Sequence, residues 1–371
     1  MAQDVLFNPL QLGAIALKHR VVMAPLTRMR AKQPGDIPYA LNAEYYGQRA
    51  SDGGLQITEA TDINPFTKGY VWVPGIFTAE QVQGWKAVTE AVHAKGGFIF
   101  NQIWHVGRIS HTLLQPNCVL PVAPSAIAAP GNTSDAQGNS VPYETPRALE
   151  LDEIAAITKD FVQAARNARE AGFDGVEVHG ANGYLIDQFL NDGSNQRTDQ
   201  YGGSIENRAR FLLEVVDAVG AAIGTDRMGV RLSPWSGIQG MQDSSGVALW
   251  EYVVRELGKR KIAYLHLIEP RSDFTNDEKP LDVSAPDVAS LFRKAFGGPV
   301  ISAGGFVPET AAEAVSAGKS DAVAFGRPFI ANPDLPQRIK VGAALNKHVR
   351  ATFYGGGAEG YTDYPFMVAI D

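Results

Sequence analysis

LDEIAAITKDFVQAARNAREAGFDGVEVHGANGYL, residues 151–185, contains the alternation that decides the fold. Its first part, residues 151–172, spaces apolar residues three and four positions apart and ends in glycine, which predicts an amphipathic helix. GVEVHG, residues 175–180, is short and largely apolar and predicts a buried strand. A helix that leads directly into such a strand is typical of a βαβ repeat and therefore of a parallel sheet.

The same alternation recurs along the whole chain. A second amphipathic helix is predicted over residues 78–96, and eight short runs are predicted as strands. These runs are RVVMAPLT (20–27), GLQITEA (54–60), GFIFNQIWH (97–105), GVEVHG (175–180), MGVRLS (228–233), YLHLIE (264–269), PVISAGG (299–305) and DAVAFG (321–326). Eight units favour an α/β fold with a single (β/α)8 TIM barrel and loop insertions, in one domain over residues 1–371, more than an open doubly wound sheet.

Composition limits the classes of partner. The chain has 371 residues, 45% hydrophobic and 20% charged, as expected of a soluble globular protein. Its 33 Lys and Arg against 40 Asp and Glu give a net charge of −7, which favours small-molecule partners over nucleic acid or an anionic membrane. Cys118 is the single cysteine and cannot form an internal disulfide. Because we find neither a signal peptide nor an apolar stretch long enough to span a bilayer, we expect a cytoplasmic protein.

Polar residues gather at the ends of the predicted strands. In a TIM barrel the C-terminal ends of the strands face the active site, so side chains there are candidates for function. They are Thr27, Glu59, Gln102, His105, His179, Arg231, His266 and Glu269, followed by the pairs Gly304-Gly305 and Gly326-Arg327. The period of two in a strand places Glu177 and His179 on one face, with Val176 and Val178 turned toward the helices.

The two glycine pairs indicate a phosphate site. Gly304-Gly305 and Gly326-Arg327 follow the seventh and eighth strands, where barrels commonly bind phosphate through loop amides. Glycine lets the backbone approach a ligand closely, and Arg327 adds a positive charge with a forked set of donors. The alternative is a pair of tight strand-to-helix turns with a surface arginine.

Two further segments rich in turn residues lie outside the repeat. Residues 355–360 match GxGxxG, but no strand precedes them and no helix follows, so we expect a flexible loop that exposes its backbone and not a dinucleotide site. Residues 129–146, APGNTSDAQGNSVPYETP, form an insertion after the third strand. Loops of this length are often lids or binding loops, and a mobile surface loop is the alternative.

The end of the fourth strand offers side chains for catalysis. His179 and Asn182 are donors that can grip one carbonyl or nitro oxygen, as in an oxyanion hole. Tyr184 keeps its proton at neutral pH and can donate it. Alternatively, the His-x-x-Asn segment caps the next helix and Tyr184 only packs. His105, His179 and His266 could also converge on zinc, although no HxH or HExxH spacing supports a metal site.

A longer run of residues is more specific than any of these pairs. HGANGYLIDQFLNDGSNQRTDQYGGSIENRARFLLEVVDAV (179–219) resembles the old yellow enzyme family of FMN-dependent ene-reductases. The resemblance continues through MAPLTR (23–28), EYYGQRA (44–50), QIWHVGR (102–108), PRALELDEI (146–154), FGRPFIANPDL (325–335) and YGGGAEGYTDYP (354–365). It covers nearly the whole chain, and within the family it is greatest to bacterial reductases of the N-ethylmaleimide and nitrate-ester type.

This resemblance implies an oxidoreductase that binds FMN non-covalently at the strand ends of the barrel. The residues implied at the flavin ring are Pro25, Thr27, Ala60, Gln102 and Arg231, and those implied at the phosphate are Gly304, Gly305, Gly326 and Arg327. A cation at Arg231, beside N1 and O2 of the flavin, would stabilise negative charge on the reduced ring. NADPH or NADH would reduce FMN and leave before the substrate enters the same pocket.

The resemblance also implies the substrates and the catalytic residues. The substrates would be α,β-unsaturated carbonyl compounds and nitroalkenes with an activated C=C bond, together with nitrate esters or nitroaromatics as xenobiotics. His179 and Asn182 would bind the activating oxygen, and Tyr184 would protonate the carbon next to the activating group. Family members carry either His-Asn or His-His at the first two positions, and both pairs donate hydrogen bonds.

Three aromatic residues match pocket positions of the family. They are Tyr70, Trp104 and Tyr354, for which ordinary packing at the barrel rim is the alternative. Residues 129–146 and 235–246 match no strict family pattern, so they do not indicate a substrate preference. The choice between NADPH and NADH and the oligomeric state are not readable from these motifs.

Overall fold

Eight parallel strands close into a barrel. In the computed structural model, which describes residues 2–272, 281–282 and 284–368, these strands follow one another around the barrel in chain order. They are β3 (Val21–Met23), β4 (Leu55–Ile57), β6 (Phe98–Trp104), β11 (Gly175–Gly180), β12 (Met228–Leu232), β13 (Tyr264–Ile268), β14 (Val300–Ala303) and β15 (Ala322–Phe325). Since β15 pairs with β3 and β6 pairs with β11, the sheet closes on itself.

This closure confirms the predicted (β/α)8 fold and excludes the open sheet. Each of the eight predicted ranges contains one barrel strand. Residues 1 and 371, the limits of the predicted single domain, lie outside the described residues.

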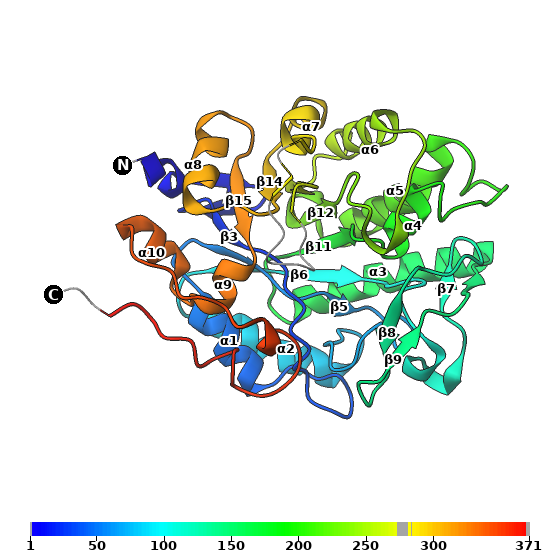
Figure 1. Cartoon of the computed structure of the whole chain (residues 1–371), viewed down its shortest axis with the longest axis horizontal. Coiled ribbons are helices and arrows are strands. Elements are labelled where there is room, and N and C mark those ends of the chain that lie inside the picture. Colours follow the sequence, from blue (N-terminus) through cyan, green and yellow to red (C-terminus); the bar gives the residue numbers. More distant parts are fainter. Residues whose placement is uncertain (1, 273–280, 283, 369–371) are drawn as a thin grey trace.

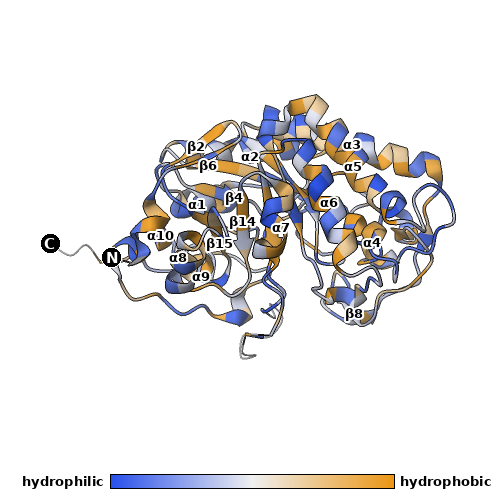
Figure 2. Ribbon diagram, turned by 90° about the horizontal axis from the view of Figure 1, so that it is seen from above, coloured by the Kyte–Doolittle hydropathy of each residue, from blue (hydrophilic) through white to orange (hydrophobic). Residues whose placement is uncertain are grey.

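Helices surround the barrel (Figure 1). They are α1 (Ala40–Arg49), α2 (Ala79–His93), α3 (Leu151–Glu170), α4 (Leu185–Leu190), α5 (Ile205–Ile223), α6 (Val247–Lys259), α7 (Val288–Phe296), α8 (Pro308–Ser316), α9 (Arg327–Ala331) and α10 (Leu335–Val341). The predicted helices are α2 and α3, and α2 begins after Thr78, whose side chain accepts a hydrogen bond from the Gln81 amide at 3.2 Å. Helices α3 and α5 carry both hydrophilic and hydrophobic residues (Figure 2). No helix in the described part of the chain combines the length and the apolar character that crossing a bilayer needs.

Several short elements, which the sequence did not predict, accompany the eight barrel strands. The short strands are β1 (Leu10–Leu12), β2 (Ile15–Leu17), β5 (Thr61–Asp62), β7 (Val122–Ala123), β8 (Asn132–Ser134), β9 (Ser140–Pro142) and β10 (Arg147–Ala148). The 3-10 turns are η1 (Ala2–Phe7), η2 (Thr112–Leu114), η3 (Pro116–Cys118), η4 (Thr225–Arg227), η5 (Ile238–Gly240) and η6 (Arg350–Thr352). The pair β8–β9 is an antiparallel hairpin inside the insertion of residues 129–146.

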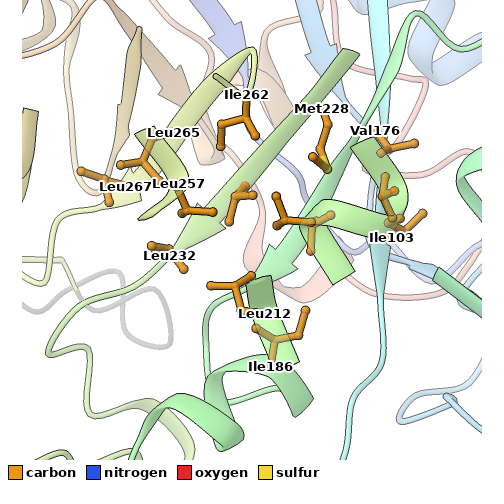
Figure 3. Packing of buried hydrophobic residues seen from close by; sticks show 14 of the residues in the cluster. Ile103, Val176, Ile186, Leu212, Met228, Leu232, Leu257, Ile262, Leu265 and Leu267 are labelled. Atoms are coloured by element: carbon orange, nitrogen blue, oxygen red, sulfur yellow. The ribbon is translucent and has the colours of Figure 1, made fainter. Parts of the chain in front are cut away.

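Two large apolar clusters hold the barrel together. One fills the layer between strands and helices, and it includes Val176 and Val178, as the period of two predicts. Figure 3 shows part of this layer beside strands β11 to β13. The other fills the interior of the barrel and contains Leu12 and Leu17 of the β1–β2 hairpin. The amide of Ala14 in this hairpin donates to the Asp226 carbonyl, just before β12, so the hairpin covers the N-terminal ends of the strands. The polar residues described next lie toward the opposite, C-terminal ends.

Candidate active site

Inward-facing polar side chains form two layers in the upper part of the barrel. The strand register pairs Glu177 with Gln102 in the lower layer. In the upper layer it pairs His179 with Arg231, and Arg231 with His266. All five side chains are buried, and Arg231 is the most exposed of them at 8%. Buried polar groups need partners, either from the protein or from a ligand.

Glu177 is the centre of the lower layer. Its carboxylate accepts hydrogen bonds from Gln102 Nε2 at 2.7 Å and from His266 Nδ1 at 2.9 Å. Burial alone would raise the pKa of Glu177, but His266 and Arg231 outweigh burial and hold this pKa below its usual value. The ionised carboxylate therefore offsets the charge of Arg231, while the bond to Nε2 leaves the Gln102 amide oxygen as an acceptor.

Arg231 carries an unused donor. Its Nε is buried and has no hydrogen-bond partner among the described residues. An unpartnered cationic donor at a strand end fits an electron-rich or anionic edge of a bound ligand. The chemistry of the donor set, an amide oxygen from Gln102 and a cation from Arg231, fits the polar edge of a flavin ring.

His179 and Tyr184 lie against each other at the end of β11, and Asn182 lies in the turn between them. The His179 ring centroid lies 5.1 Å from that of Tyr184, and Trp104 lies against both rings, at 6.0 Å from His179 and 4.6 Å from Tyr184. Asn182 Oδ1 is buried without a partner, so the amide of this side chain is not used in helix capping. The N-cap of α4 is Tyr184, which makes no side-chain cap bond. The part of the alternative in which this segment caps the helix is therefore wrong, whereas Tyr184 does pack, against Trp104.

His179 is a neutral donor. Its Nδ1 accepts a weak hydrogen bond from the Ala181 amide at 3.3 Å, which assigns the ring proton to Nε2. Burial, together with the nearby Arg231 and His266, holds the pKa of His179 well below its usual value. At neutral pH this imidazole can donate a hydrogen bond from Nε2 without carrying a charge.

Tyr184 pairs with a second tyrosine. Its hydroxyl lies 3.0 Å from the Tyr70 hydroxyl, and the Tyr70 ring stacks on Trp104 with centroids 6.0 Å apart. Burial raises the pKa of Tyr184 and of Tyr70, so both phenols keep their protons at neutral pH. The structure thus places Tyr70 and Trp104, which the resemblance gave as pocket residues, against His179 and Tyr184 at the end of the fourth barrel strand.

Two loops add residues that the sequence analysis missed. The side chain of Gln239, from residues 235–246, lies near the hydroxyls of Tyr70 and Tyr184, and its Oε1 is buried without a hydrogen-bond partner. Tyr143, from residues 129–146, packs against the same apolar cluster as Tyr70 and Tyr184. A contact of this insertion with the pocket supports a binding loop over a mere surface loop. Neither residue belongs to a periodic pattern. The signal in the sequence that could have indicated them was the position of the two insertions, which follow barrel strands at the end where the active site lies.

Tyr354 lies at the rim. It is 57% exposed and packs edge-on against Phe353, at a centroid distance of 6.3 Å. The following segment, residues 355–360, comes after the turn η6 and not after a strand, which agrees with the rejection of a dinucleotide motif. Its carbonyls are held by arginines: Arg30 Nε donates to Gly357 at 3.0 Å, and Arg28 Nη2 donates to Gly360 at 2.8 Å.

The residues predicted beside the flavin ring on the first two strands lie close together. Pro25 and Thr27 follow β3, and Ala60, which is 2% exposed, follows β4. The Glu59 carboxylate links the two segments because it accepts hydrogen bonds from the Arg28 amide at 3.0 Å and the Met29 amide at 3.1 Å.

The glycine pairs lie on neighbouring strands. Gly304 and Gly305 follow β14, Gly326 and Arg327 follow β15, and the register pairs these two strands. Gly304 has φ +116°, and a Cβ there would approach the Glu269 carbonyl oxygen to 2.7 Å. Glycine is therefore required for backbone reasons alone. This geometry is compatible with the phosphate site and with the alternative of tight turns.

The three histidines considered as zinc ligands each use Nδ1 in a hydrogen bond within the protein, which for His179 is the bond from the Ala181 amide. His105 Nδ1 accepts from the Gly107 amide at 3.0 Å, and His266 bonds to Glu177. Within the described residues, no group of three or more His, Cys, Asp or Glu is arranged to hold a metal ion.

The chain is similar to known flavin enzymes over nearly its whole length. Residues 5–346 match the family described as NADH:flavin oxidoreductase / NADH oxidase. The 12-oxophytodienoate reductase 1 of Oryza sativa subsp. japonica is 48% identical over 368 residues, which cover 99% of this chain and 94% of the relative. The flavin oxidoreductase hxnT of Emericella nidulans is 48% identical over 385 residues and covers 98% of both chains. The structure of morphinone reductase in complex with tetrahydroNAD matches with a TM-score of 0.90 and 52% identity, over 98% of each chain.

Proposed function

Since this chain belongs to the NADH:flavin oxidoreductase / NADH oxidase family, as a flavin-dependent oxidoreductase of the old yellow enzyme type, we propose that it reduces the activated C=C bond of α,β-unsaturated aldehydes, ketones and imides. The observation that carries this proposal is the contact of His179 and Tyr184 with each other and with Trp104 at one strand end, where the buried Oδ1 of Asn182 has no partner. Two relatives are named for the reduction of carbonyl compounds, 12-oxophytodienoate and morphinone. Either NADH or NADPH serves as the reductant in this proposal, and the whole chain forms one domain.

FMN would be held by residues from several strands. Gln102 and Arg231 would contact the polar edge of the flavin ring, and Pro25, Thr27 and Ala60 would line it. The phosphate would be bound by Gly304, Gly305, Gly326 and Arg327. The unpartnered Nε of Arg231 supports this placement, because the structure offers a buried cationic donor that no protein group satisfies. When bound, FMN would supply the hydride chemistry, accepting a hydride from the nicotinamide and passing it to the β carbon of the substrate.

His179 and Asn182 hold the activating oxygen of the substrate. Nε2 of the neutral His179 and Nδ2 of Asn182 donate hydrogen bonds to the same oxygen, on which negative charge develops as the β carbon accepts hydride. Donors that are fixed before the reaction stabilise this charge without reorganisation. Burial of His179, which is 4% exposed, strengthens the hydrogen bond because water is excluded.

Tyr184 supplies the proton. Its phenol is protonated at neutral pH and stands beside the oxygen-binding pair, so it can protonate the α carbon of the substrate. The Tyr70 hydroxyl, 3.0 Å from that of Tyr184, can donate a hydrogen bond to the phenolate that this transfer leaves.

The oxygen-binding pair does not require a ketone. A nitro oxygen accepts hydrogen bonds from the same two donors, so nitroalkenes belong to the proposed substrates, and nitrate esters and nitroaromatics extend them. Reduction of such compounds would make xenobiotic reduction part of the function. A cytoplasmic location is part of the proposal, and the single cysteine, Cys118, suits a reducing compartment.

A substrate panel tests the proposed function. The FMN-loaded protein is assayed anaerobically for oxidation of NADH and NADPH with cyclohexenone, a nitroalkene and cyclohexene, and the products are identified. Cyclohexenone and the nitroalkene should be reduced at the C=C bond, whereas cyclohexene has no oxygen for His179 and Asn182 to bind. The proposal is wrong if cyclohexenone is not reduced, or if cyclohexene is reduced equally well.

A further inference from the structure

The turn that presents Asn182 has an uncommon backbone. Asn182 has φ 58° and Gly183 has φ 79°, so two consecutive residues adopt the left-handed conformation between β11 and α4. A side chain makes that conformation unfavourable, and a residue other than glycine keeps it where surrounding contacts hold it. The direction in which the Asn182 side chain leaves the backbone therefore depends on those contacts.

Two buried side chains hold the amides of this turn. The Asn182 amide donates to Ser233 Oγ at 2.8 Å, and the Gly183 amide donates to Asp187 Oδ2 at 2.8 Å. The Ser233 hydroxyl in turn lies 3.5 Å from Asp187 Oδ2. Asp187 is 1% exposed and Ser233 is 2% exposed, so water competes little for these bonds.

Asp187 is fully engaged as an acceptor. Its Oδ1 accepts from Asn191 Nδ2 at 2.8 Å, in addition to the bonds that reach Oδ2. A carboxylate can accept on both oxygens, whereas an amide of the same shape offers one acceptor and one donor. Asparagine at this position could satisfy Gly183 or Asn191, but not both.

A cavity lies beside the two side chains that hold the turn. It has a volume of about 250 Å3 and adjoins Asp187 and Ser233, with Trp235, Met241 and Trp250 among its other walls. Side chains do not fill this space, so Asp187 and Ser233 depend on their hydrogen bonds for support on the cavity side. The Asn182 side chain itself has an unpartnered Oδ1 and does not fix its own position through that atom.

We propose that Asp187 and Ser233 are positioning residues that hold Asn182 where its amide binds the substrate oxygen, an inference that rests on the proposed function. They act through the backbone of Asn182 and Gly183 and touch neither substrate nor cofactor. Loss of either contact lets the turn relax, and the Asn182 donor then misses the oxygen.

A double-mutant cycle tests this coupling on the full-length, FMN-loaded protein. Asp187→Asn and Ser233→Ala are each made alone and together with Asn182→Ala. The probe is cyclohexanone, which has the oxygen but no C=C bond, and its Kd is measured from the change in flavin absorbance. The rate of flavin reoxidation by cyclohexenone is the second readout.

The expected result is non-additive. Each single variant should bind cyclohexanone about ten-fold more weakly, since a buried hydrogen bond to a charged or ordered group is lost. In the Asn182→Ala background the same changes should cost less than about two-fold, because the donor that they position is already gone. Equal losses in both backgrounds would show a general structural effect and overturn the inference.

A matched control uses the other end of the same strand. Asp174 precedes β11, and its Oδ2 accepts a hydrogen bond from the Ile99 amide at 2.8 Å. Asp174→Asn therefore also replaces a carboxylate that binds a backbone amide. This variant should leave the Kd of cyclohexanone unchanged. If Asp187→Asn does not fold, Ser233→Ala alone tests the inference. This variant removes a single hydroxyl beside a cavity, so we expect it to fold.

The test separates the inference from the proposed function. If Asn182→Ala changes neither the Kd nor the reoxidation rate, the proposed role of Asn182 fails, and the inference falls with it. If Asn182→Ala weakens both but Asp187→Asn and Ser233→Ala weaken neither, the proposed function stands and the inference alone is wrong.

Discussion

The Tyr70 hydroxyl lies 3.0 Å from the Tyr184 hydroxyl, at the end of the strand that carries His179. Burial raises the pKa of both phenols, so both keep their protons and the pair carries no charge at neutral pH. Either hydroxyl can donate the hydrogen bond between them. The two tyrosines nevertheless have different proposed roles, because Tyr184 is closer to the oxygen-binding pair and Tyr70 supports it.

Replacement of Tyr184 separates the two half-reactions. Tyr184→Phe keeps the ring against Trp104 but removes the proton donor, so flavin reoxidation by cyclohexenone should slow by about 100-fold or more. Flavin reduction by NADH should stay within about two-fold of the parent rate. Stopped-flow absorbance measures both rates. Equal slowing of the two would mean that Tyr184 shapes the pocket and does not donate the proton.

Tyr70→Phe is the matched comparison. It removes one hydroxyl from the same pair and retains the ring that stacks on Trp104. Because this change leaves the donor in place, reoxidation should slow by no more than about ten-fold, the value of one hydrogen bond. If Tyr70→Phe slows reoxidation as much as Tyr184→Phe does, the proposed assignment of Tyr184 as the proton donor and Tyr70 as its support is wrong.

Asn182→Ala tests the oxygen-binding pair. Removal of one donor from such a pair typically costs about 100-fold or more in rate, so reoxidation by cyclohexenone should fall on that scale. Asn167→Ala on α3 serves as the control, because Asn167 Nδ2 also donates a hydrogen bond, to the Ile76 carbonyl at 2.7 Å, away from the barrel mouth. Turnover of cyclohexenone at the parent rate by Asn182→Ala would remove this residue from the mechanism.

Arg231→Met tests the flavin site without relying on turnover. The side chain keeps its bulk and loses the buried cation whose Nε has no protein partner. FMN should bind about ten-fold or more weakly, and bound FMN should become harder to reduce. Fluorescence titration of the apoprotein with FMN gives the affinity, and a redox titration gives the potential. If neither quantity changes, Arg231 does not contact the flavin.

The pH dependence follows from the two reacting groups. Burial holds the pKa of His179 well below its usual value and raises that of Tyr184, so His179 is already neutral, and Tyr184 still protonated, between about pH 8 and pH 9. The reoxidation rate should be constant in this range. Burial also raises the pKa of Asp187 to about 7, so we assign a change of rate around and below that pH to the positioning residue Asp187 and not to the two reacting groups. A sigmoidal change of rate between about pH 8 and pH 9 would show that one of the two reacting groups titrates there.

Local patterns were enough to predict the barrel. Every barrel strand lies inside a predicted range, because parallel strands buried on both faces are short apolar runs between amphipathic helices. The direction of Val176 and Val178 toward the helices followed from the period of two. The hairpin β1–β2 was not predicted, since runs of three residues give too little periodicity to identify a strand.

The candidate site was predicted only in part. Residues at strand ends, such as His179 and Arg231, could be placed because the topology of a barrel brings strand ends together. Gln239 and Tyr143 could not, because each reaches the pocket from a loop whose path depends on tertiary contacts. The contact of Ser233 with Asn182 joins segments 51 positions apart, and no local pattern indicates it.

Anaerobic reoxidation of the reduced protein tests the central claim most directly. The FMN-loaded protein is reduced with one equivalent of NADH, mixed with cyclohexenone, and followed by flavin absorbance, with the product identified afterwards. The account predicts rapid return of the oxidised flavin spectrum and one equivalent of cyclohexanone. A flavin that stays reduced in the presence of the enone, or reoxidation without formation of cyclohexanone, would contradict it.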